Sequence, residues 1–189
     1  MTIIIWDVDD VLNELTENWL NSINHSLVRT KQQLTSPEFH AILGWSRENY
    51  LQSLDGYRRA SFADLIPNAS IQAFMAHNNH VVHLVLTATP MLSAHLSAEW
   101  TIRHFGSWVD GFLLAPSARA GSNSDRSTKY DHISRLVSDH DRVICIDDQP
   151  SNVVTAQRAG ATAILWPQPW NESTQSCDDA LQRLSQLIS

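Results

Sequence analysis

The chain has 189 residues, enough for one globular domain or for a core domain with a small insertion. Hydrophobic residues make up 43% and charged residues 17% of it, which excludes a disordered tail or linker. The formal net charge is −7, from 13 basic and 20 acidic residues with no basic cluster, so a nucleic acid polymer is excluded as the expected partner.

Signals for export, membrane insertion and disulfide formation are missing from the sequence. The first residues lack a basic segment followed by a long apolar run, and no stretch reaches the length of a membrane span. Only Cys145 and Cys177 are present, so no disulfide framework is expected. We therefore expect a cytoplasmic protein without a membrane partner. The oligomeric state is left open.

The first predicted strand ends in a pair of carboxylates. Residues 3–6 form a continuous apolar run, typical of a buried strand, and Asp7-Val8-Asp9 follows at once. Alternate residues of an extended chain face the same side, so Asp7 and Asp9 can approach one centre. Open α/β sheets bind ligands at the carboxyl ends of their strands. We expect both carboxylates at a ligand site.

A series of helical patterns separates the first strand from the second. Apolar residues recur every four positions in the first pattern, at Leu15, Trp19, Ile23 and Leu27. Ser36-Pro37 then begins a helix that stops at Gly44, and Ser46 begins another that stops at Asp55-Gly56. A last helix begins at Asn68. The sequence thus predicts an all-helical insertion over residues 14–76 and a core domain of residues 1–13 and 77–189.

Strands and helices alternate from about residue 80, which is typical of parallel β-α-β units. Strands are expected at residues 81–86, 112–114, 143–146 and 163–166. Helices are expected near 91–105, 128–138, 150–159 and 177–188, and residues 117–127 are expected to form a mobile loop. The predicted fold class is therefore α/β: a five-stranded, parallel, doubly wound, Rossmann-like sheet with a small helical insertion after the first strand.

Further groups suited to phosphate chemistry follow in chain order. Thr87 and Ala88 come directly after the second predicted strand, and Lys129 opens a helical pattern. A second acid pair, Asp147 and Asp148, ends a later strand. Paired carboxylates, a hydroxyl and an ammonium are the groups that phosphoryl transfer with a divalent cation uses.

This ordered set resembles the haloacid dehalogenase superfamily of phosphotransferases, and the resemblance covers nearly the whole chain. It implies that Asp7 is the nucleophile and that Asp9 is the general acid and base. It implies that Thr87 and the backbone N–H of Ala88 bind phosphate, and that Lys129 stabilises the charge of the transition state. It also implies that the helical insertion forms a cap over the active site.

The resemblance implies a Mg²⁺ ion as cofactor. Two unit charges about 4 Å apart repel by roughly 4 kcal/mol at an effective dielectric near 20, so clustered carboxylates and a phosphate need a cation. The expected ligands are Asp7, the backbone carbonyl of Asp9, and Asp148, with Asp147 a direct or water-mediated ligand. The sequence departs from the commonest family pattern at Asp10 and at Asn152, which concerns the surroundings of the metal.

The expected reaction is hydrolysis of a small phosphorylated metabolite through an aspartyl-phosphate. Thr87-Ala88-Thr89-Pro90 and Ile146-Asp147-Asp148 resemble the 5′(3′)-deoxyribonucleotidase branch, so a nucleotide and a phosphosugar both stay open. A phosphomutase with the same intermediate and a non-catalytic binding protein are the alternatives. A dehalogenase is disfavoured because it needs neither Asp9 nor a metal, and a receiver domain because its acids and Lys follow a different order.

Substrate specificity is expected to come from the insertion. The break Gly44-Trp45-Ser46-Arg47 joins two predicted helices, a place where an aromatic ring and a guanidinium can face a cleft together. We expect Trp45 and Arg47 to act as specificity residues. The nine histidines show no metal-binding spacing.

Overall fold

A computed structural model describes residues 1–26, 28–117, 127–171 and 173–189, and shows one five-stranded parallel sheet. The strand order is β3-β2-β1-β4-β5. The strands are β1 (Thr2–Trp6), β2 (Val82–Thr87), β3 (Val109–Leu114), β4 (Arg142–Asp147) and β5 (Thr162–Leu165). The predicted fold class is confirmed. The loop expected at residues 117–127 lies almost wholly outside the described residues.

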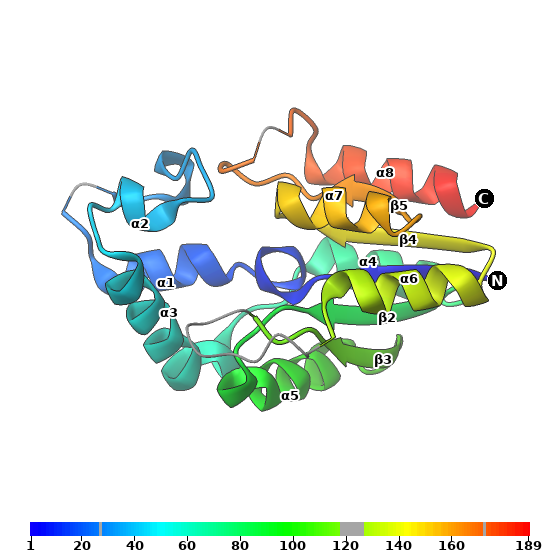
Figure 1. Cartoon of the computed structure of the whole chain (residues 1–189), viewed down its shortest axis with the longest axis horizontal. Helices are drawn as coiled ribbons and strands as arrows, with labels where there is room; N and C mark the ends of the chain where they lie inside the picture. Colours follow the sequence, from blue (N-terminus) through cyan, green and yellow to red (C-terminus); the bar gives the residue numbers. More distant parts are fainter. Residues whose placement is uncertain (27, 118–126, 172) are drawn as a thin grey trace.

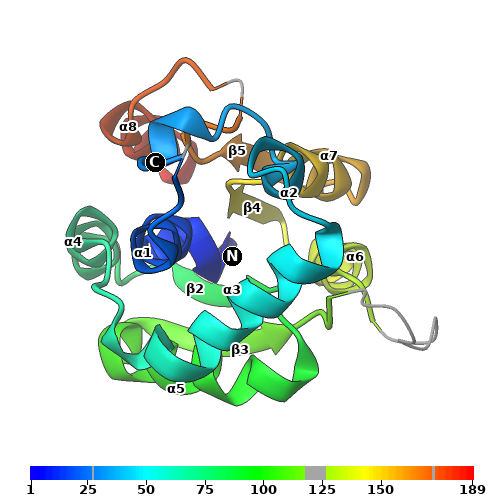
Figure 2. The same cartoon turned by 90° about the vertical axis from the view of Figure 1, so that its left-hand side faces the viewer.

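Helices cover both faces of the sheet (Figure 2). One face packs against α4 (Ala69–His77), α5 (Ala94–Phe105) and α8 (Cys177–Ile188), and the other against α6 (Lys129–Asp139) and α7 (Pro150–Arg158). The alternation of β1 explains the two cores. Ile4 and Trp6 belong to the first and Ile3 and Ile5 to the second. A strand buried on both faces reads as a continuous apolar run, as the sequence does here.

The inserted helices lie at the carboxyl ends of the strands, far from both chain termini (Figure 1). They are α1 (Leu15–Ile23), α2 (Phe39–Ile42) and α3 (Arg47–Ser61). Short 3₁₀ turns occur at Lys31–Gln33, Phe62–Asp64 and Met91–Ser93. The insertion therefore stands where an open α/β sheet binds its ligand.

The two ends of the insertion are joined to each other. The backbone N–H of Asn68 donates to the carbonyl of Leu12 at 2.8 Å, and its side-chain amide reaches the carbonyl of Val11 at 3.4 Å. Helix α4 follows at once and packs on the sheet, where Phe74 meets Trp6 edge to face at 5.9 Å between ring centroids. The division into core and cap stays a prediction, but by its contacts α4 lies with the helices of the sheet.

Helix α3 is longer than the sequence pattern indicated. Ser46 caps it as predicted, because its hydroxyl accepts from the backbone N–H of Asn49 at 3.1 Å. The predicted stop at Asp55-Gly56 is wrong, since the helix continues to Ser61. Glycine disfavours a helix interior by only about 1 kcal/mol relative to alanine, which the packing of a long helix outweighs.

The other predicted helix ends in the insertion agree more closely with the structure. Gly44 has φ +67° and follows Leu43, the C-cap of α2, which suits the glycine predicted to end that helix, although α2 begins at Phe39 and not at Pro37. Asn68 caps α4 by accepting from the backbone N–H groups of Ser70 and Ile71. Among the described residues, none of the helices has the length and apolar character needed to cross a membrane.

Candidate active site

Three carboxylates meet at the carboxyl ends of β1 and β4. The two strands are neighbours with Trp6 beside Ile146, and the N–H of Asp7 donates to the carbonyl of Ile146 at 3.0 Å. This register places Asp7 next to Asp147 and Asp148. One carboxylate oxygen from each of the three lies within 4.8 Å of the others, and all three residues are buried.

Lys129 lies among these acids. It is the first residue of α6, whose start is fixed by a capping box between Thr128 and Asp131. Its ammonium donates to Asp7 Oδ1 at 2.8 Å and to Asp147 Oδ2 at 2.6 Å. Burial alone would lower the pKa of Lys129, but Asp147 and Asp7 outweigh burial and raise it. The ammonium therefore stays charged and offsets two of the carboxylates.

The ammonium of Lys129 does not balance the negative charge of the three carboxylates. Burial raises the pKa of Asp7 to about 7, with Asp147 and Asp9 adding to this effect and Lys129 opposing it. Burial also raises the pKa of Asp148 well above its usual value. Buried carboxylate oxygens this close together are the donors that a hard divalent cation prefers. The residues present thus fit a hard divalent cation such as Mg²⁺, which Asp7, Asp148 and Asp147 would hold.

Hydrogen bonds from the last loops orient Asp148. Its Oδ2 accepts from the indole N–H of Trp170 at 2.9 Å and from the amide of Gln149 at 2.8 Å. Its backbone carbonyl accepts from the side chain of Asn171 at 2.7 Å. The ring of Trp170 also meets Phe39 of α2 at 5.0 Å between centroids. Trp170 therefore contacts both an acid of the core and a helix of the insertion.

The position of Asn152, which departs from the family pattern, has a clear role. Its side-chain amide donates to Asp147 Oδ1 at 3.0 Å, and the N–H of Gln149 donates to the same oxygen at 2.9 Å. With Lys129 on the other oxygen, Asp147 is held on both sides. An acid in place of Asn152 would bring a negative charge to this carboxylate.

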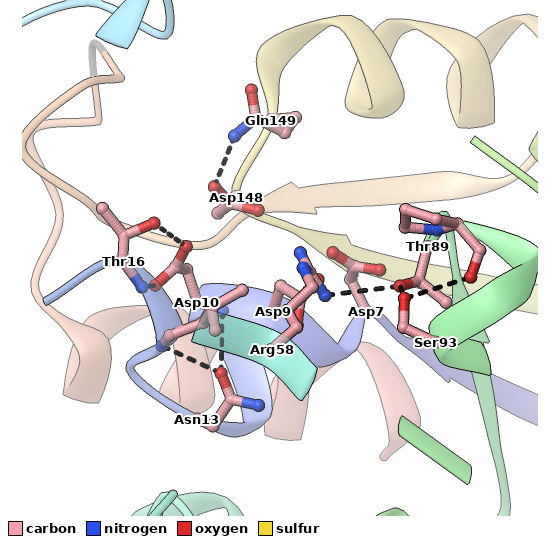
Figure 3. Close-up of polar contacts among 12 residues, drawn as sticks. Asp7, Asp9, Asp10, Asn13, Thr16, Arg58, Thr89, Ser93, Asp148 and Gln149 are labelled. Atoms are coloured by element: carbon pink, nitrogen blue, oxygen red, sulfur yellow. Dashed lines mark hydrogen bonds and ion pairs between the residues drawn. The ribbon is translucent and has the colours of Figure 1, made fainter. Parts of the chain in front are cut away.

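Asp10, the other departure, closes the loop after β1. It has φ +61°, a left-handed conformation that Asp tolerates better than most residues. Its carboxylate accepts from the backbone N–H of Thr16 at 2.8 Å and from the Thr16 hydroxyl, which ties the loop to the start of α1 (Figure 3). Its carbonyl accepts from Gln168 at 2.7 Å. Burial raises the pKa of Asp10 to about 7, and the bonds from Thr16 oppose that shift.

Sequence reasoning missed Arg58, the residue of α3 that contacts Asp9. Arg58 Nη2 donates to Asp9 Oδ2 at 2.5 Å, and Nη1 donates to the Thr89 hydroxyl at 3.3 Å (Figure 3). Burial alone would lower the pKa of Arg58, but Asp9, Asp55 and Asp10 outweigh it and raise the pKa. The missing signal was the continuation of α3 past Gly56, which puts Tyr50, Leu54 and Arg58 four residues apart on one face.

A cavity of about 210 Å³ joins these groups. Acids and Lys129 form its polar side, and apolar or aromatic residues of the insertion face them. The polar side includes Asp7, Asp9, Asp10, Asp148 and Lys129, and the insertion contributes Leu15, Phe39, Tyr50, Leu54 and Arg58. The strand ends therefore line one part of the cavity and the insertion lines another.

The other predicted site residues take different places. Ala88 lines the cavity, whereas Thr87 is buried at the end of β2 and does not line it. Trp45 packs edge to face against Trp19 at 6.3 Å between centroids and lines a separate surface hollow. Arg47 is exposed at the start of α3. The structure does not bring Trp45 or Arg47 to the cavity with the acids.

Solved structures of low sequence identity match almost the whole chain. A haloacid dehalogenase-like hydrolase from Streptococcus pneumoniae matches with a TM-score of 0.63 at 13% identity, over 97% of this chain and 90% of its own. A Clostridium acetobutylicum protein described as a predicted phosphatase matches with a TM-score of 0.66 at 15% identity, over 98% and 99%. A Thermotoga maritima protein provisionally assigned as a β-phosphoglucomutase matches with a TM-score of 0.60 at 15% identity, over 99% and 100%.

These matches show the fold that the chain shares with haloacid dehalogenase-like hydrolases. No protein-family model matches the sequence, and no curated protein matches it.

Proposed function

We propose that the protein is a Mg²⁺-dependent phosphatase that acts in the cytoplasm on a small phosphorylated metabolite, through an aspartyl-phosphate formed on Asp7. The observation that carries this proposal is Asp7 Oδ1 held by Lys129 at 2.8 Å, beside carboxylate oxygens of Asp147 and Asp148. A carboxylate oriented by an ammonium, next to a cluster that suits a divalent cation, is equipped for covalent phosphoryl transfer. The shared fold with hydrolases supports the same reaction class.

The residues divide the reaction between them. Mg²⁺, when bound by Asp7, Asp148 and Asp147 with the backbone carbonyl of Asp9, supplies positive charge against the phosphate. Asp7 attacks phosphorus while the bond to the leaving oxygen breaks, and Asp9 gives that oxygen a proton. Asp9 then takes a proton from water, whose oxygen attacks phosphorus and releases inorganic phosphate from Asp7. In this proposal Lys129 and the Ala88 N–H stabilise the phosphoryl oxygens. The predicted phosphate contact of Thr87 requires a different position from the one it has here, since Thr87 does not line the cavity.

The size of the cavity favours a small substrate. Its volume of about 210 Å³ lies below the roughly 300–1,000 Å³ typical of sites for larger organic ligands. A sugar phosphate or a smaller phosphometabolite suits this cavity alone, whereas the alternative substrate, a 5′(3′)-nucleotide, would also need the hollow of about 480 Å³ that shares Ala88, Lys129 and Asn152 with it. A phosphomutase using the same intermediate is the second candidate reaction, favoured by the match to the Thermotoga maritima protein.

The test is phosphate release from a panel of phosphate monoesters that includes p-nitrophenyl phosphate. We expect turnover with Mg²⁺, none after chelation by EDTA, and recovery when Mg²⁺ is added back. Asp7→Asn should lower the rate by at least about 10³-fold, because an amide cannot act as the nucleophile. Asp139→Asn, an exposed acid at the end of α6, is the matched control and should retain full rate.

Full release by Asp7→Asn would overturn the assignment of the nucleophile, and full release in EDTA would overturn the role of Mg²⁺. Transfer of phosphate within the substrate, with little net release, would identify the phosphomutase instead. No reaction with any ester would leave a non-catalytic binding protein as the better account.

A further inference from the structure

The ion pair between Arg58 and Asp9 joins the insertion to the residue with the proposed role of general acid. Both side chains are largely buried, with 8% of the Arg58 side chain and 16% of the Asp9 side chain exposed. Arg58 also donates a longer bond of 3.3 Å to Thr89, whose hydroxyl lies 3.4 Å from that of Ser93. Arg58 therefore links α3 to the segments that follow β1 and β2.

The pairing leaves hydrogen-bonding capacity unused on both partners. Within the described part of the chain, Arg58 Nε and Asp9 Oδ1 are buried without a hydrogen-bond partner. A buried polar atom without a partner destabilises the protein, because its lost hydrogen bonds to water are not replaced. A guanidinium has donors that match the two oxygens of a carboxylate or phosphate. Arg58 thus retains a buried donor at a cavity that is open to a ligand.

The present partner of Arg58 conflicts with the proposed chemistry of Asp9. Asp9 Oδ2 accepts from Arg58 at 2.5 Å, and the ion pair uses the negative charge of the Asp9 carboxylate. A general acid has to carry a proton, which removes that charge and leaves the buried guanidinium without its counter-ion. Breaking a buried ion pair without a replacement leaves an uncompensated buried charge, so Arg58 needs another anion.

The position of Arg58 defines where that anion lies. The residues proposed to bind the reacting phosphate, Asp7, Ala88 and Lys129, come from the strand ends and from α6, whereas Arg58 comes from α3 of the insertion. Phe39, Tyr50 and Leu54 of the insertion supply apolar and aromatic surface beside it. When Asp7, Ala88 and Lys129 hold the phosphate under attack, Arg58 is left on the insertion side of the cavity to meet an anionic group of the leaving group.

Resting on the proposed phosphatase function, we propose that Arg58 selects phosphate esters whose leaving group carries a second anionic group. That group replaces Asp9 as the partner of Arg58, satisfies the Nε donor, and releases Asp9 to protonate the leaving oxygen. A substrate with a neutral leaving group leaves the ion pair in place and reacts slowly. Substrate selection and the engagement of the acid are thus the same event.

The experiment compares two esters of similar size, 3-phosphoglycerate with an anionic leaving group and glycerol 3-phosphate with a neutral one. Wild-type kcat/KM should be at least about tenfold higher for 3-phosphoglycerate. Arg58→Gln should lower this value at least about tenfold for 3-phosphoglycerate, mostly through KM, and change it less than about threefold for glycerol 3-phosphate. Arg58→Lys, which keeps the charge but loses the paired donors, should fall between them.

Arg59→Gln is the matched control, because Arg59 is the exposed neighbour on the same helix, and it should change neither ester. Thermal unfolding of each variant checks that the fold is kept. Equal wild-type kcat/KM for the two esters, or equal losses on both in folded Arg58→Gln and Arg58→Lys, would overturn the selection by Arg58 while leaving the phosphatase intact. Hydrolysis of no ester in the whole panel would overturn the phosphatase proposal and this inference with it.

Discussion

Lys129 has a structural task that is separate from any reaction. Its ammonium lies within 2.8 Å of Asp7 and 2.6 Å of Asp147, at a side-chain exposure of 8%. The Lys129→Met variant leaves these buried carboxylates without their cation. We expect its free energy of unfolding in EDTA to fall by about 3–5 kcal/mol, measured by urea unfolding.

An exposed ion pair provides the comparison for Lys129→Met. Arg103 pairs with Glu99 at 2.7 Å, but the two side chains are 51% and 66% exposed. Arg103→Met should therefore change the free energy of unfolding by less than about 1 kcal/mol. Equal losses in the two variants would mean that the strand-end carboxylates do not need their ammonium.

Helix α3 carries a glycine where its own stability favours another residue. Gly56 lies in the helix interior with helical backbone, and a Cβ added there would meet nothing within 4 Å. Gly56→Ala should raise the free energy of unfolding by roughly 0.5–1 kcal/mol, measured by urea unfolding. Gly44→Ala, at φ +67°, should instead lower it, because alanine is strained in that conformation. A loss of stability in Gly56→Ala would indicate that α3 needs to bend there.

The strands and their acids could be predicted from the sequence, whereas the length of α3 beyond Gly56 could not. The strands and the acids that follow them were predictable, because a buried strand has an apolar run and its end is local in sequence. Because the helix was predicted to end at Gly56, Arg58 was not placed on it. The packing that stabilises a helix containing a glycine comes from residues that are distant in sequence. The contact of Trp170 with Asp148 could not be predicted for a similar reason, since this hydrogen bond joins residues that are 22 positions apart.

The specificity roles predicted for Trp45 and Arg47 are subject to the same limit of prediction from sequence. The sequence identifies the break between α2 and α3 but not which face of α3 is turned to the cavity. In the structure that face begins at Tyr50, one helical turn further along. The specificity roles of Trp45 and Arg47 stay predictions, and the geometry gives Arg58 the stronger claim.

At the scale of the whole molecule, the buried acids make stability depend on pH. Burial raises the pKa of Asp7 and Asp10 from 3.8 to about 7, and that of Asp148 well above 3.8. A carboxyl with a raised pKa favours folding while it is protonated, so its contribution is full below about pH 4 and is lost as the pH rises toward 7. The lowered pKa values of His83 and His104 act in the opposite direction around pH 6.5, but these are two histidines against three carboxyls.

We therefore expect the metal-free protein to lose a few kcal/mol of stability between pH 5 and pH 8, since one pKa unit corresponds to about 1.4 kcal/mol. Urea unfolding in EDTA across this range measures the slope. Asp10→Asn should reduce it, because the amide oxygen still accepts from Thr16 but does not titrate. Mg²⁺ at pH 8 should restore stability. A flat or rising profile would contradict the electrostatic account of this site.

The bond between Leu12 and Asn68, 2.8 Å from carbonyl to N–H, has a consequence for how such a protein can change over generations. The chain leaves the sheet and returns to it at one point, so the segment between behaves as a closed loop whose length adds only about 0.6 kcal/mol for each doubling. Changes of length within this segment can leave β1 and β4 in place, provided that the contacts of Thr16 with Asp10 and of Arg58 with Asp9 are kept. Heritable variation can thus remodel the recognition of a substrate while the strands that carry the acids are inherited unchanged.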